Sequence, residues 1–166
     1  ACGSVEGMRV PGSFPGATEI PVQFDDLMKA FAARVGLPSV DRDAGGRCWF
    51  QTEDNVALQC FSPTRGTVIL EGVVGSLPEE EPKAAEWLKR LMQLNLPRLQ
   101  ARQEVLTVDR EKRQLVLCRQ WLAEEKTLED FVLVAESFMN ALEWWQKQAA
   151  GSLAPPPPAG SFLFTR

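Results

Sequence analysis

The residue types that most often do chemistry in proteins are scarce in this sequence. Its 166 residues include no histidine and no tyrosine. Without histidine, the chain lacks the commonest general base, the usual partner of serine and cysteine nucleophiles, and a common zinc ligand. The glycine-rich phosphate loops GxxxxGK[ST] and GxGxxG are missing as well. These absences leave pairs of carboxylates as the remaining candidates for catalysis.

The carboxylates themselves favour a structural interpretation. The densest acidic stretch, Glu79-Glu80-Glu81, lies between Pro78 and Pro82. This composition is typical of the first turn of a helix, where negative charge meets the positive end of the helix dipole. A carboxylate pair needs only that the fold bring two acids together, so a small carboxylate-based enzyme stays as a distant alternative. We predict no enzyme activity, no catalytic residues, no cofactor and no metal.

The cysteines do not form a metal-binding pattern either. The four of them are Cys2, Cys48, Cys60 and Cys118, and three lie within apolar runs, where cysteine is usually a small buried residue. A three-residue hairpin loop would place Cys48 directly opposite Cys60, within reach of a disulfide. Since the sequence does not otherwise look like a small disulfide-stapled domain, we expect three or four free thiols on titration of the unfolded, unreduced protein.

The charge balance excludes two classes of partner. The chain has 22 acidic and 18 basic residues, a formal net charge of -4, and therefore exerts no strong pull on nucleic acid or on anionic membranes. No apolar run approaches the roughly 18 residues that span a bilayer, and the first residues lack a basic region followed by an apolar one. We expect a soluble protein that is not exported and that binds neither nucleic acid nor membrane.

Residues 47–74 organise the chain, because their alternation predicts a three-stranded antiparallel meander with turns at residues 53–55 and 63–66. One side of these strands is apolar throughout: Cys48, Phe50, Val56, Leu58, Cys60, Val68 and Leu70. The other side is mixed: Arg47, Trp49, Gln51, Ala57, Gln59, Phe61, Thr67, Ile69 and Glu71. A sheet with one apolar and one half-apolar face must cover both faces or offer the second to a partner.

Helical spacing of apolar residues predicts three helices around this meander. They cover residues 24–35, about 83–95, and a last one that begins after Thr127 and runs for about five turns. Thr127 is expected to cap the amides at Glu129 and Asp130. Residues 105–108 and 114–121 are expected to form a hairpin. We expect the second helix either to cover the second sheet face or to meet its own copy in a dimer.

The predicted class is therefore α+β, in the order α-β-β-β-α-β-β-α, with a twisted antiparallel sheet packed by helices. Residues 1–20, rich in glycine and proline, are expected to be a flexible leader, residues 21–148 the domain, and residues 149–166 a proline-rich tail.

With this order in place, residues 21–147 resemble the class I type III secretion chaperones, the Tir-chaperone-like family. The resemblance rests on Val35-Gly36-Leu37 after the first helix, the hairpin of residues 48–61, Gly75-Ser76-Leu77-Pro78, Leu91-Met92-Gln93-Leu94-Asn95, and the aromatic-rich last helix. It implies a secretion-chaperone-like homodimer in the bacterial cytoplasm that binds an N-terminal segment of a secreted virulence effector in extended form, without ATP hydrolysis. A secretion ATPase or export gate is a further implied partner.

Carried onto this chain, the resemblance implies two groups of site residues. The effector-binding candidates are Leu27, Phe31, Trp49, Phe61 and Ile69. The candidates for the dimer interface are Trp87, Leu88, Leu91, Met92 and Val105. Ordinary core packing is an alternative role for each of them. A rival function is a chaperone-like adaptor that binds a secretion regulator or an apparatus component. The apolar run Phe162-Leu163-Phe164 raises the further hypothesis that the tail occupies the client groove in the free protein.

Overall fold

A computed structural model describes residues 23–37, 40–52, 56–98, 102–124 and 126–151. The predicted leader, Cys2, and residues 152–166 of the proline-rich tail lie outside the described residues. The helices are α1 Phe24–Val35, α2 Glu81–Asn95 and α3 Leu128–Ala149, with a short 3-10 turn at Leu96–Arg98. The strands are β1 Asp41–Arg42, β2 Cys48–Gln51, β3 Ala57–Phe61, β4 Thr67–Ser76, β5 Val105–Asp109 and β6 Gln114–Leu122.

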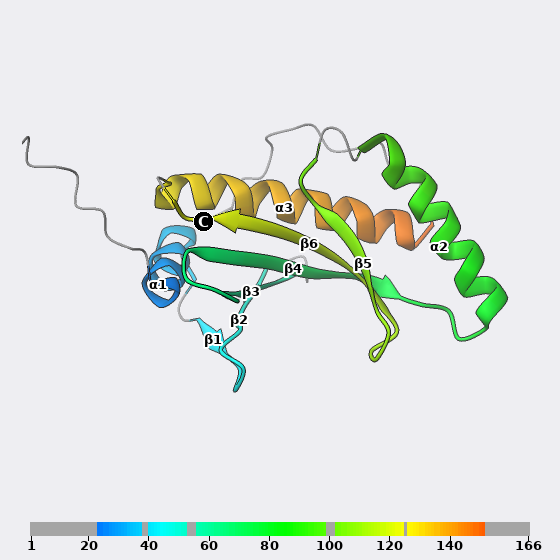
Figure 1. The fold of residues 1–166 in the computed structure, drawn as a ribbon, viewed down its shortest axis with the longest axis horizontal. Coiled ribbons are helices and arrows are strands. Elements are labelled where there is room, and N and C mark those ends of the chain that lie inside the picture. Colours follow the sequence, from blue (N-terminus) through cyan, green and yellow to red (C-terminus); the bar gives the residue numbers. More distant parts are fainter. Residues whose placement is uncertain (1–22, 38–39, 53–55, 99–101, 125, 152–166) are drawn as a thin grey trace, which may run out of the picture.

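The strands form one antiparallel sheet in the order β1-β2-β3-β4-β6-β5 (Figure 1). The α+β prediction is confirmed, and the bounds of α1 agree with the predicted ones. Strand β1 was not predicted, because two residues are too short to show an alternation. It exists through its pairing with β2 and through an ion pair from Arg42 to Asp25 on α1.

The apolar side of the predicted meander is the core. Each of its seven residues is at most 6% exposed. Helices α1 and α3 pack against this side, and Phe31 of α1 makes edge-on ring contacts with Phe50 and Phe131 at centroid distances of 5.1 and 5.2 Å. Helix α3 approaches β4 so closely that a Cβ on Gly72 would lie 2.2 Å from Leu142 Cδ2. A side chain at this position would displace Leu142, which is itself fully buried, so glycine permits the close contact of helix and strand.

Helix α3 begins at the predicted cap. Thr127 Oγ1 accepts a hydrogen bond from the Asp130 backbone amide (3.3 Å), and the Asp130 carboxylate accepts one from the Thr127 amide (2.7 Å). The hydrogen bonds that the Asp130 carboxylate accepts from the Thr127 amide and from Thr127 Oγ1 (2.8 Å) lower the pKa of Asp130. The helix then continues for 22 residues, longer than the five turns predicted. It runs along the sheet from α1 at one end to α2 at the other (Figure 1).

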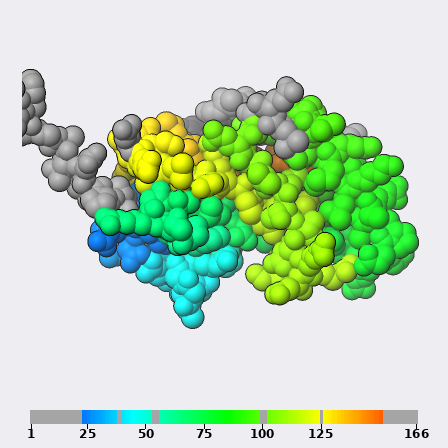
Figure 2. Space-filling model, in the orientation of Figure 1, coloured from blue at the N-terminus to red at the C-terminus, as the bar shows by residue number. Residues whose placement is uncertain are grey.

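Helix α2 does not cover the second face of the sheet. It packs beside the end of α3, where Trp87 Nε1 donates to the Ala149 carbonyl (3.0 Å) and Arg90 donates to the Gln148 carbonyl (2.8 Å). In the space-filling view it forms a lobe at one end of the molecule (Figure 2, green, right). Of the two roles predicted for α2, covering the second sheet face is wrong, and that face is left without this helix.

Candidate functional site

The candidate site is the face of the sheet that points away from α1 and α3, which we call the open face. The strand registers place Trp49, Gln59, Glu71, Cys118 and Val105 in one row across β2, β3, β4, β6 and β5. At about 4.8 Å between neighbouring strands, the row is roughly 19 Å long. Both of its ends are apolar and accessible, since Trp49 is 43% and Val105 58% exposed.

Neighbouring rows add further apolar side chains to the open face. Phe61 and Ile69 lie directly opposite each other and are both half-buried. Val73 is 39% and Leu122 47% exposed. Large apolar side chains that share one sheet face and remain accessible are typical of an interaction surface rather than of a core.

A polar cluster lies among these apolar residues. Arg47 pairs with Glu71 (Nη1 to Oε2, 3.4 Å), and its guanidinium stacks 4.2 Å from the Phe61 ring centroid. The Gln59 side-chain oxygen accepts from Arg47 Nε (3.2 Å) when its amide is turned to satisfy both groups. The two charges neutralise each other, so the centre of the open face carries hydrogen-bonding groups without a net charge.

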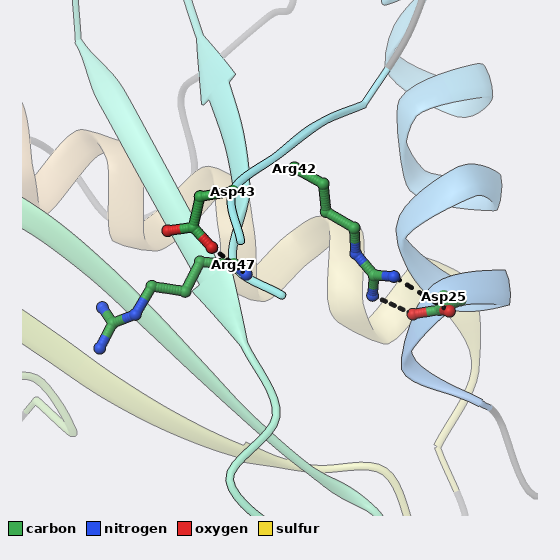
Figure 3. A network of polar contacts seen from close by, with 4 residues as sticks. All are labelled: Asp25, Arg42, Asp43 and Arg47. Atoms are coloured by element: carbon green, nitrogen blue, oxygen red, sulfur yellow. Dashed lines mark hydrogen bonds and ion pairs between the residues drawn. The ribbon is translucent and has the colours of Figure 1, made fainter. Parts of the chain in front are cut away.

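The turn between β1 and β2 fixes the direction of this arginine (Figure 3). Asp43 Oδ1 accepts from the backbone amides of Gly45 and Arg47, both at 2.9 Å. Arg42 extends toward α1, where it pairs with Asp25, whereas the side chain of Arg47 extends away from α1 (Figure 3). The two arginines of one short turn thus serve different sides, one anchoring the hairpin to α1 and the other contributing to the open face.

Beside the open face, part of β4 lacks a partner strand on one side. β3 pairs with β4 only over Gln59–Phe61, whereas β6 pairs with it from Thr67 to Ser76. Within the described ranges, the β3 side of residues 73–76 therefore has no strand beside it. The molecular outline is notched between the β1–β2 turn (cyan) and the β5–β6 hairpin (yellow-green) (Figure 2).

A shallow hollow of about 340 Å³ lies at this unpaired part of β4. Its lining comes from β2, β3, β4 and α3: Trp49, Ala57, Gln59, residues 71–76 and Gln146. Gln146 Nε2 donates to the Val73 carbonyl (2.8 Å) and so occupies one backbone acceptor. Unpaired strand edges are where extended segments add to a sheet.

The open face unites three of the five predicted effector-binding residues. Trp49, Phe61 and Ile69 all lie on it. Leu27 and Phe31 do not, because they face the other side of the sheet and are 3% and 1% exposed. Their helical spacing predicted a buried stripe but could not tell which part of that stripe reaches the surface. Val73 was missed, although the alternation that ends at Glu71 needed only one more step to include it.

The predicted interface residues differ in how far they are exposed in the single chain. Leu91 is fully buried within its own chain at 0% exposure, and Trp87 and Leu88 are half-buried. Met92 and Val105 are accessible at 39% and 58%. Val105 stands on the edge strand β5, in the same row as Trp49. The most exposed apolar residue of this region is Leu96 at 70%, just past the end of α2, and the sequence analysis did not single it out.

The described part of the chain shows no metal-binding cluster, no helix that could span a membrane and no disulfide. It contains no group of three or more histidine, cysteine, aspartate or glutamate side chains that could hold a metal ion. Among its helices, none is long and apolar enough to cross a membrane. Cys48 and Cys60 are directly opposed, as the loop length predicted, but both are free thiols, as is Cys118. Burial raises the pKa of all three, that of Cys118 to about 11.

The chain is similar to known proteins in sequence pattern and in fold. The model of the Tir chaperone protein (CesT) family matches residues 26–146. No curated protein sequence gives a significant match.

Solved structures share the fold at low sequence identity. A chain of the ExsC–ExsE complex has a TM-score of 0.59 at 23% identity, covering 78% of this chain and 96% of that one. A chain of the HopA1–SchA chaperone–effector complex has a TM-score of 0.56 at 15% identity, covering 75% and 93%. A chain of the complex between the Yersinia pestis type III secretion chaperone SycH and a stable fragment of YscM2 has a TM-score of 0.53 at 13% identity, covering 74% and 99%.

Proposed function

Because this chain belongs to the Tir chaperone protein (CesT) family, we propose that it is a type III secretion chaperone whose open sheet face holds the N-terminal segment of a secreted effector in extended form. The observation that carries the proposal is the row of side chains from Trp49 to Val105 on a sheet face without a covering helix in the described structure. Binding keeps the effector soluble and ready for secretion.

The chemistry of the open face suits an extended client. An added strand gains main-chain hydrogen bonds at an unpaired edge, and its alternate side chains enter shallow apolar patches. Residues 73–76 of β4 supply such an edge, and Trp49 and Val73 supply apolar contacts beside it. Because Arg47 and Glu71 neutralise each other, the surface selects for apolar content more than for a particular charge.

The proposed function includes neither catalysis nor a cofactor. Binding of an extended segment requires no covalent step, and the chain has no histidine. We therefore propose a non-enzymatic protein without a cofactor. Its place of action is the bacterial cytoplasm, where an effector waits before export. The secretion ATPase or export gate stays a predicted further partner.

Recovery of the client tests this function. The tagged full chain is isolated from its native host, and the bound protein is identified and digested by limited proteolysis with mass spectrometry. We expect a secreted protein that is shielded near its N-terminus. A transcriptional regulator or an apparatus subunit in its place would establish the adaptor function, and recovery of no partner would contradict both.

We propose further that the protein is a homodimer joined through the outer side of α2. Leu88, Met92 and Leu96 recur at four-residue spacing, which places them along one side of the helix and its continuation. Met92 and Leu96 are accessible in the single chain, and burying them against a second copy would remove an exposed apolar strip from water.

The interface is tested by Met92→Asp in a measurement of molecular mass by light scattering. We expect the variant to be a folded monomer, because a charge in an apolar interface is left without a partner. Leu91→Asp is not suitable, since Leu91 is buried in its own chain and the variant would unfold. Leu133→Asp, an exposed position on α3, is the matched control and should stay dimeric. A dimeric Met92→Asp variant would contradict the assignment.

A further inference from the structure

The hollow beside β4 lies close to the point where the chain leaves α3. A Cβ on Gly75 of β4 would lie 3.5 Å from the Ala149 Cβ, at the last residue of the helix. Gln146, one turn earlier, lines the hollow directly. Gly151 then adopts a left-handed conformation (φ 88°), which ends the helical path. The end of α3 therefore lies near the rim of the hollow, and residues 152–166 follow it in the sequence.

The sequence of residues 152–166 has two parts, a proline-rich part and a last part that contains two phenylalanines. Residues 155–158 are four prolines, which lack amide hydrogens and so cannot add to a strand edge. They favour an extended spacer of about 3.1 Å per residue. Residues 160–166 contain no proline, and in extended form their Phe162 and Phe164 point to the same side. The spacing matches what an unpaired strand edge beside an apolar patch accepts.

The reach of the spacer is sufficient. From Gly151 to Phe162 there are eleven residues, which span up to roughly 35 Å when extended. The whole row from Trp49 to Val105 is shorter than this, at roughly 19 Å. The tail needs neither a second copy nor a change in the domain to reach the hollow, and a tethered segment has a high effective concentration there.

We propose that residues 160–166 dock in this hollow on their own chain, with Phe162 and Phe164 against Trp49 and Val73. The docked segment shields two accessible apolar side chains and the unpaired edge of β4 while no other segment is bound. Docking involves this chain alone, so the proposal stands or falls independently of the proposed function and of any client.

Alkylation of Cys118 in the full chain tests the proposal. Cys118 lies opposite Glu71, which lines the hollow. The wild-type chain is compared with the double variant Phe162→Ser, Phe164→Ser. Leu153→Ser is the matched control, because it removes an apolar residue that lies before the four prolines and outside residues 160–166. Each cysteine is followed separately by peptide mass spectrometry, and hydrogen exchange of residues 73–76 is recorded in parallel.

We expect the double variant to react about tenfold faster at Cys118, which corresponds to about 1.4 kcal/mol of docking free energy, and to exchange faster at residues 73–76. Leu153→Ser should behave as the wild type. Equal rates in all three chains would overturn the proposal. Protection that rises with protein concentration would also overturn it, because the occupant would then be the tail of a second copy.

Discussion

The two faces of the sheet differ in what completes them. On one face six inward residues of β2, β3 and β4, together with Val56 before β3, meet α1 and α3 and are nearly inaccessible. On the open face Trp49, Val73 and Val105 remain accessible around a neutral polar cluster. The first face is completed by the chain's own helices, and the second is suited to completion by another segment. Mutations should therefore affect stability on one face and binding on the other.

The largest expected contrast is between Phe31→Ala and Trp49→Ala. Phe31 is 1% exposed and contacts two aromatic rings, so its truncation should reduce the free energy of unfolding by about 3–5 kcal/mol. Trp49 is 43% exposed, and its truncation should cost less than about 1 kcal/mol. Denaturant unfolding measures both. Similar losses for the two variants would mean that the open face is part of the core.

Cysteines on the two faces of the sheet should differ in their reactivity toward an alkylating reagent. Cys60 on the covered face is 0% exposed and burial raises its pKa, whereas Cys118 on the open face is only half-buried. Cys60 should react only when the domain opens, at a rate at least about 10³ lower than that of an exposed thiol. Because the pKa of Cys118 is about 11, its alkylation rate should keep rising above pH 9. Native-state labelling followed by peptide mapping separates the two sites, and comparable rates would contradict the assignment of faces.

A smaller effect concerns the cap of the helix that covers the first face. Thr127→Ala should reduce the free energy of unfolding by about 1 kcal/mol. Since the pKa of Asp130 is lowered in the folded protein, its contribution is present above the unfolded pKa of about 3.9 and is lost as pH falls through the folded value. Unfolding at a series of pH values should show this loss in the wild type and not in Asp130→Asn, and the same pH dependence in both chains would contradict the capping role.

The sequence predicted the covered face well because burial imposes a strict alternation. Every residue assigned to the apolar side of the meander is buried, and Cys48 does lie opposite Cys60. The open face was harder to predict, since a surface kept for a partner has no such constraint. The contact of Arg47 with Glu71 and Gln59 depends on the register of three strands, which only the fold fixes.

Helical stripes were less informative about the site than the alternation of the strands. The spacing of Leu27, Phe31 and Leu91 predicted correctly that each lies on an apolar stripe, but all three are enclosed by their own chain. Periodicity identifies the side of a helix that is buried and does not identify what buries it. The accessible positions, Met92 and Leu96, lie at the edge of that stripe, where a helical pattern is weakest.

The most direct test of the central claim measures the affinity of the recovered client segment for matched variants on the two sides of the molecule. Trp49→Asp changes the open face, and Leu133→Asp changes a position on α3 that is 64% exposed. We predict at least about a tenfold loss of affinity for Trp49→Asp, or 1.4 kcal/mol, with Leu133→Asp unchanged and both proteins folded. Equal affinities for the two variants would contradict the assignment of the open face as the client-binding surface.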